Sequence, residues 1–222
     1  MYASNALALN AIDPLPSVLE QPRPPGSSRR HRIARIDLDA RGLDRFNTLL
    51  ERVGGGNAPL DSDRIATAAR QLLDGGEAGA GPAMPRCIRQ QLRRGTALAW
   101  MVGDPGWTAA NDAGEVAALV VGYLRGQDDL IPDSLPRIGR LDDAIVVKAA
   151  WSRLEDEVAD YLDFNRVRRI EAALRGLPAL EFRFDRQDWI QARMAEAALA
   201  GHRRGIRESS YLPRPAALFS IH

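Results

Sequence analysis

Five aspartates between residues 128 and 143 are the side chains of this sequence best suited to chemistry. They are Asp128, Asp129, Asp133, Asp142 and Asp143. Carboxylate oxygens are hard ligands that suit Mg²⁺, Mn²⁺ or Ca²⁺. Two such ions can activate water and stabilise the leaving group of a phosphate ester. If at least three of these carboxylates converged around an open position, the chain would be a metal-dependent hydrolase.

The same aspartates also suit structural roles. Their spacing does not match a calcium-binding loop, and no histidine or cysteine lies nearby to favour zinc. Asp142 and Asp143 open an apolar helix, where carboxylates stabilise the positive end of the helix dipole. Asp133 follows Pro132 and can accept hydrogen bonds from backbone N–H groups. Because Arg140 and other arginines can neutralise these acids, we assign no cofactor and keep the aspartates as candidate ligands of a divalent ion.

Other catalytic arrangements find no support in the sequence. The three histidines, His31, His202 and His222, lie near expected domain edges or in the tail, and Cys87 has no evident catalytic partner. Neither a G-x-S-x-G elbow nor a phosphate-binding glycine loop is present. The acidic run that includes Glu157 is interpreted as a solvated helix face. We therefore expect no catalytic residue, although the metal-dependent alternative stays open.

Two short helices and a stiff connection must position the aspartates. Residues 115–124 place apolar side chains on one face of a helix, and Gly126 suits a left-handed residue at its end. Pro132 and Pro136 each fix φ and remove a backbone donor, so the loop between the helices is stiff. Gly139 predicts a turn, and a second apolar helix starts at Leu141. The stretch predicts a helical hairpin whose loop packs back onto its helices.

This stretch resembles the YkvA-like family, a small bacterial domain of unknown function. The resemblance covers residues 97–152 and rests on the motif Tyr123, Asp129, Pro132, Asp133, Pro136, Gly139, Asp142 and Asp143. It implies a helical hairpin, and the family has no catalytic residues to transfer. Some relatives associate with membranes, but the apolar runs here are far shorter than the roughly 20 residues of a spanning helix.

The remainder of the chain predicts more helices. Asp61 or Ser62 caps one of them, and Asp185 caps the last. The helix from Leu141 is expected to run to Leu162, and a separate apolar stripe at 167–174 predicts another helix that Gly176 ends. We expect a disordered arm at 1–31, a helical segment at 32–76, a linker at 77–84, a helical domain at 85–201 and an irregular tail at 202–222. Alternating residues at 32–39 and 180–184 could pair as a minor two-stranded β element. The expected fold is mainly α, a multi-helix bundle around the short hairpin.

Composition narrows the function without naming it. The formal net charge is +1, so the whole chain carries no electrostatic signal for nucleic acid. A strong structural motif without a nucleophile, base or cofactor loop favours a non-enzymatic binding or scaffold protein, with a protein partner or self-association. The alternatives are a Mg²⁺- or Mn²⁺-dependent hydrolase and a peripheral membrane protein. The resemblance implies a bacterial protein. We expect a cytoplasmic setting, since Cys87 is the only cysteine and allows no intramolecular disulfide.

Overall fold

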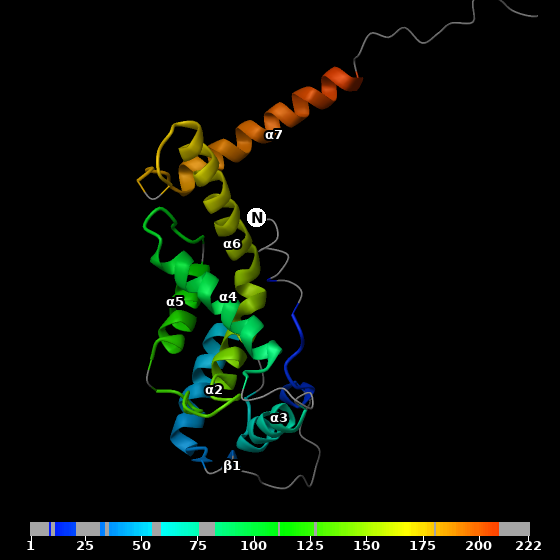
Figure 1. Ribbon diagram of the computed structural model, residues 1–222, viewed down its shortest axis with the longest axis vertical. Helices are drawn as coiled ribbons and strands as arrows, with labels where there is room; N and C mark the ends of the chain where they lie inside the picture. Colours follow the sequence, from blue (N-terminus) through cyan, green and yellow to red (C-terminus); the bar gives the residue numbers. More distant parts are fainter. Residues whose placement is uncertain are drawn as a thin grey trace, which may run out of the picture. The chain divides into compact units, whose positions relative to one another are not determined.

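The protein is mainly helical, as the sequence predicted (Figure 1). The computed structural model describes residues 9, 12–20, 32–33, 36–54, 59–75, 83–110, 112–126, 128–179 and 181–208. The chain divides into two compact units, Met1–Arg166 and Val167–His222. The boundary falls inside a helix, whereas most of the linker expected at 77–84 lies outside the described residues.

The first unit contains a short 3₁₀ helix, a pair of two-residue strands and most of the helices. In chain order these are η1 (Ser17–Leu19), β1 (Arg32–Ile33), β2 (Ile36–Asp37), α2 (Ala40–Gly54), α3 (Ser62–Asp74), α4 (Arg86–Gly103), α5 (Ala113–Leu124) and the first part of α6 (Leu141–Leu174). Helix α4 packs on α5, α2 also contacts α5, and α3 contacts both η1 and β1. Helix α5 of the hairpin therefore packs against both α2 and α4.

The β element forms locally instead of between distant segments. Strand β1 pairs antiparallel with β2, with Ile33 opposite Ile36 and Arg32 opposite Asp37. Residues 181–184 are not in a strand, so the pairing expected between 32–39 and 180–184 is wrong for the described residues. Proximity in sequence explains the result, because closing a short hairpin loop costs less chain entropy than closing a long one.

The start of α6 is the centre of the first unit. Residues 141–147 are all buried, so no face of the first two turns meets water. Leu141, Val146 and Leu154 are fully buried there, and Ile131 and Ile138 of the preceding loop join them. A helix segment that is buried all round needs neighbours on every side. The chain supplies them, so the apolar face of the hairpin is covered by its own polypeptide.

Part of the expected N-terminal arm packs against this core. Leu15 and Leu19 are buried, and residues 17–19 form η1. Polar side chains hold its backbone: Gln90 accepts a hydrogen bond from the N–H of Asp13 at 2.8 Å, and Arg64 donates to the carbonyl oxygens of Val18 and Leu19. The prolines suggested disorder, because proline cannot donate the backbone hydrogen bonds of regular secondary structure. Here side chains of α3 and α4 bond to the backbone of the segment instead.

Helix α6 is one continuous helix and not the two that the apolar stripes suggested. The residues between the stripes, 163–166, include no proline or glycine to break it. It ends at Leu174, and Gly176, with a φ of 69°, follows as the expected glycine stop. The N–H groups of Gly176 and Leu177 bond to the carbonyls of Ala173 and Ala172, which closes the helix end.

The second unit continues from this end into α7 (Arg186–Glu208). Asp185 begins α7 as predicted: its carboxylate accepts from the N–H of Asp188, and Asp188 accepts from the N–H of Asp185, both at 3.0 Å. This reciprocal pair is a capping box. Residues 202–208 are helical, which corrects the irregular tail expected from residue 202, and residues 209–222 lie outside the described part.

The turn before α6 depends on an unusual backbone. Arg137 has a φ of 70°, and the N–H of Ile138 bonds to the carbonyl of Pro136 at 2.9 Å, which makes a γ-turn with a left-handed central residue. The Arg137 guanidinium donates to the carbonyl of Leu72 in α3 at 3.2 Å. Gly126 ends α5 without a positive φ, so the left-handed conformation expected there is wrong.

Gly139 provides the first test of this turn. A Cβ at this position would meet the carbonyl oxygen of Asp133 at 2.5 Å and that of Leu135 at 2.8 Å. Both atoms belong to the backbone and cannot rotate away. We expect Gly139→Ala to lower the free energy of unfolding by about 2 kcal/mol or more, measured by urea denaturation.

Gly122→Ala is the matched control. Gly122 lies inside α5, and no atom of the surrounding structure lies within 4 Å of the position that a Cβ would take. Alanine there should raise the free energy of unfolding by about 0.5–1 kcal/mol, since alanine is the better helix former. Equal stability of Gly139→Ala and the wild type would contradict the close backbone approach.

Candidate functional site

Three hydrogen-bond donors converge on the carboxylate of Asp142. Its Oδ2 accepts from the Tyr123 hydroxyl at 2.8 Å and from the backbone N–H groups of Leu130 and Ile131 at 2.9 and 3.0 Å. The side chain is almost fully buried. The carboxylate therefore ties the end of α5 and the connecting loop to the start of α6. The sequence predicted donors from the first turn of its own helix, whereas these three come from Tyr123 of α5 and from the loop.

Asp143 and Asp133 share one arginine. The Arg140 guanidinium forms ion pairs with the buried Asp143 carboxylate and, at 3.1 Å, with the half-exposed carboxylate of Asp133. Arg140 precedes α6 directly, so the cation and Asp143 lie one helical turn apart. The backbone cap expected for Asp133 is replaced by this contact. A protein cation thus occupies the position between two carboxylates that a metal ion would need.

The prolines and glycine of the motif shape the loop around these acids. The N–H of Leu135 bonds to the carbonyl of Pro132 at 3.0 Å, and the N–H of Gly139 bonds to the carbonyl of Leu135 at 3.0 Å. Pro136 supplies the acceptor of the γ-turn. These turns bring residues 130 and 131 back over the start of α6. Every motif residue expected from the sequence therefore lies in one connected structure.

Burial dominates the acid–base behaviour of the site. It raises the pKa of Asp142, although the N–H of Ile131 and the Tyr123 hydroxyl oppose the rise. Burial and the Asp142 charge raise the pKa of Asp143 to about 7, with Arg140 acting in the other direction. Burial first, and then Asp142, raise the pKa of Tyr123. Two adjacent buried carboxylates disfavour double ionisation, so the site holds a proton more readily than ordinary aspartates do.

The aspartates do not form a metal-binding constellation within the described residues, which include all five of them. Asp128 is exposed. Burial and then Asp133 raise the pKa of Asp129, which places that carboxyl near other acids. Asp142 points to amide donors and Asp143 to Arg140. This arrangement suits the structural interpretation of the cluster better than the metal interpretation.

A second buried carboxylate, Glu157, was missed by the sequence reasoning. Its Oε1 accepts from the Trp107 indole N–H at 2.9 Å and from the N–H of Ala110 at 3.2 Å. The side chain is buried, so the expected solvated face is wrong at this position. Tyr161, one turn further along α6, donates to Asp104 at 3.2 Å. These contacts hold the loop between α4 and α5. The Asp104–Trp107 stretch was the sequence feature that could have indicated them.

The remaining candidates do not join a site. Cys87 is buried in the first turn of α4, and burial raises the pKa of its thiol. His202 is exposed on α7, while His31 and His222 lie outside the described residues. No helix within the described ranges is long and apolar enough to cross a membrane.

Comparison with known families supports the resemblance. Residues 116–149, which run from α5 through the turn into α6, match the model of a family described as "Protein of unknown function (DUF1232)". This confirms the expectation of a domain of unknown function at the hairpin and is consistent with the YkvA-like resemblance. No curated protein and no solved structure matches the chain.

The raised pKa of Asp143 predicts a pH-dependent stability. The folded protein retains a proton up to about pH 7, while the unfolded chain releases it near pH 4. Between these values the folded state binds more protons, so the free energy of unfolding should fall as pH rises from about 4 to about 7. Urea denaturation at several pH values measures this slope.

Asp143→Asn should remove most of that slope, even if the variant is less stable at every pH. Asp128→Asn, which removes an exposed carboxyl from the same loop, controls for the loss of one negative charge. Two results would contradict the assignment of this proton to Asp142 and Asp143. One is a wild-type free energy of unfolding that rises steadily from pH 4 to pH 7. The other is an unchanged slope in Asp143→Asn.

Proposed function

We propose that this chain, whose hairpin matches the DUF1232 family, is a non-enzymatic binding or scaffold protein. In this proposal the first unit is a rigid support, and the second unit contacts a protein partner. The partner is a helical protein surface, and a second copy of the chain is the first one to test. A cytoplasmic location belongs to the same proposal, since Cys87 is the only cysteine of the sequence.

The observation that carries the proposal is the placement of exposed apolar side chains. Nine large apolar residues of the described chain are exposed, and six of them lie in the second unit. Those six are Ile170, Leu174, Leu177, Ile190, Met194 and Leu199. Leu174 and Met194 are 76% and 68% exposed. Exposed apolar residues that gather in one part of a protein are typical of an interaction surface.

Helix α7 supports the same interpretation. Residues 193–202 are all exposed, so no described segment covers this length of helix. Most helical stability in proteins comes from packing of an apolar face and not from intrinsic propensity. Ile190, Met194 and Ala198 repeat at four-residue intervals and lie on one face. A partner helix packed there would supply the contacts that α7 lacks.

The hairpin does not provide a rival docking surface. Val116, Val120 and Val121 of α5 are buried, as are the first turns of α6. The sequence allowed a partner on the hairpin itself, but neighbouring helices of the same chain fill that place. The aspartates at its turn have amide, hydroxyl and arginine partners. The hairpin is thus best suited to holding the first unit together.

Met194→Glu tests the proposed surface. In an isolated monomer this exposed residue should tolerate the change within about 0.5 kcal/mol. In a self-associated protein the new charge would be buried, so the dimer should dissociate. We expect sedimentation velocity of the full chain to show concentration-dependent association that Met194→Glu abolishes.

Glu196→Gln, which changes the charge by the same amount at an exposed position on the opposite side of the helix, is the matched control and should retain association. If the wild type is a monomer at every concentration, self-association fails as an explanation. If Met194→Glu also leaves the capture of any partner unchanged, the whole proposal for this surface is wrong.

A metal titration tests the enzymatic alternative. Calorimetric titration of Mg²⁺, Mn²⁺ and Ca²⁺ should give no saturable binding, because Arg140 already neutralises Asp133 and Asp143. Saturable binding by the wild type that the double variant Asp129→Asn, Asp143→Asn loses would instead favour the metal-dependent hydrolase. Circular dichroism checks that the double variant remains folded.

A further inference from the structure

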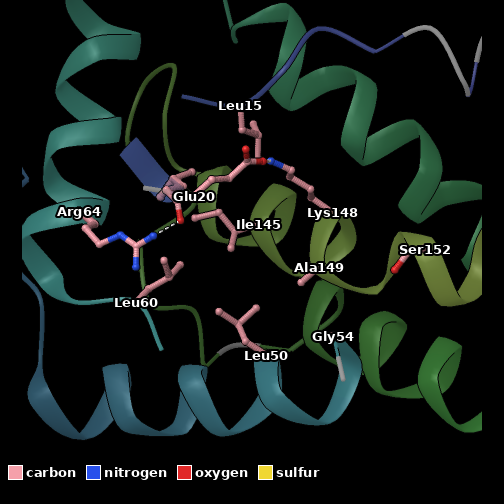
Figure 2. A pocket seen from close by; sticks show the side chains of 11 residues that line it. Leu15, Glu20, Leu50, Gly54, Leu60, Arg64, Ile145, Lys148, Ala149 and Ser152 are labelled. Carbon is pink, nitrogen blue, oxygen red and sulfur yellow. Dashed lines mark hydrogen bonds and ion pairs between the residues drawn. The ribbon is translucent and has the colours of Figure 1, made fainter. Parts of the chain in front are cut away.

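A pocket of about 330 Å³ opens in the first unit between the N-terminal segment, α2, α3 and α6 (Figure 2). It is distinct from the aspartate turn and from the exposed surface of the second unit. Its lining comes from four separate stretches of the chain, so it exists only in the folded protein. Its volume lies at the lower end of the range of about 300–1,000 Å³ that is common for small-molecule sites.

One side of the pocket is apolar. Leu50 of α2, Leu60 before α3 and Ile145 of α6 lie around the hollow in Figure 2, with Leu15 at its upper edge. Ala149 continues the same face of α6 one turn after Ile145. These side chains offer hydrocarbon contact and no hydrogen-bonding groups. An occupant must therefore present an aliphatic body to this wall.

The other side carries charge. The Lys148 ammonium is ion-paired with Glu20, and Ser152 lies one turn further along α6 (Figure 2). Arg64 also lines the pocket, but its guanidinium donates to the carbonyl oxygens of Val18 and Leu19. Lys148 is therefore the cation best placed to meet a bound anion, and Ser152 supplies a hydroxyl donor on the same helix face.

The Lys148–Glu20 pair can be exchanged. The Glu20 side chain is 65% exposed and that of Lys148 is 32% exposed. Ion pairs exposed to this degree contribute little to stability. An anion that enters the pocket can therefore replace Glu20 as the partner of the ammonium at small cost. Glu20 keeps Lys148 neutralised while the pocket is empty.

The residue type at position 148 fits this role. Lys148 is the only lysine in a chain with 30 lysines and arginines in total. A guanidinium is planar and larger, whereas an ammonium is a compact charge with three donors. The compact group leaves room in a pocket of this volume for an occupant.

We propose that this pocket binds a small amphipathic anion, with a short unbranched aliphatic chain and one carboxylate or phosphate monoester group. The aliphatic chain lies against Leu50, Leu60 and Ile145, and the anionic group replaces Glu20 on Lys148. A pocket at the lower end of the range of ligand sites suits a small occupant, with on the order of ten non-hydrogen atoms. This inference does not depend on the proposed function of the second unit.

The single lysine makes a direct test possible. Reductive methylation with ¹³C-formaldehyde keeps the positive charge and labels only Lys148 and the N-terminal amine. Titration with sodium hexanoate should shift the Lys148 signal in a saturable way. Hexyl phosphate, titrated in parallel, shows whether the site prefers a carboxylate or a phosphate monoester. Acetate, 1-hexanol and hexylammonium should each bind at least about tenfold more weakly, because each lacks the chain or the negative charge.

Two variants of the unmodified protein give opposite results if the proposal is correct. Lys148→Met should lose hexanoate binding measured by calorimetry, while Glu20→Gln should strengthen it, since the competing carboxylate is gone. A purely structural role for the ion pair would not produce tighter binding in Glu20→Gln. Arg93→Met, which removes an exposed cation that does not line the pocket, should bind like the wild type.

Three results would overturn the proposal. The first is an unchanged Lys148 signal at about 10 mM hexanoate, well above the millimolar affinity expected of a small ligand. The second is equal binding of hexanoate and 1-hexanol. The third is weaker hexanoate binding in Glu20→Gln than in the wild type, which would show that Glu20 helps to hold the anion or the pocket. Circular dichroism of each variant confirms the fold.

Discussion

The first unit depends on satisfying a carboxylate at its centre. A buried carboxyl group without partners is costly, whether it stays charged or takes up a proton. Asp142 lowers that cost through two amide N–H groups and one hydroxyl that bond to its Oδ2, and all three come from outside α6. The loop must therefore fold back over the helix start. The prolines, the γ-turn at Arg137 and the close approach at Gly139 all serve that single geometry.

Glu157, about four turns further along α6, is a second buried carboxylate that accepts hydrogen bonds from donors outside the helix. It holds the loop between α4 and α5 through the Trp107 indole and the N–H of Ala110. The ring of Trp107 packs against Tyr161 and Phe164, with ring centroids 5.7 and 5.1 Å apart. The two buried acids thus attach the loops at both ends of α5 to one central helix. Hydrogen bonds from donors fixed by the fold give each loop one preferred position.

In the two proposals, support and recognition belong to different parts of the chain. The motif that matches the DUF1232 family is internal, so its specific residues are explained by the turn that they build. Surfaces suited to a partner or a ligand lie elsewhere, on the second unit and in the pocket beside Lys148.

By itself, the sequence determined the mainly helical class, most helix ends and the turn that joins α5 to α6. These features involve residues a few positions apart, as in the cap at Asp61 and the capping box at Asp185. The continuity of α6 was missed because two apolar stripes on different faces suggest two helices. Only the tertiary structure decided which charged groups are buried and what they contact: Asp142 took its donors from the loop, and Glu157 turned inward to Trp107. The partners of a buried polar group come from distant segments, and no local pattern specifies which segments the fold will bring together.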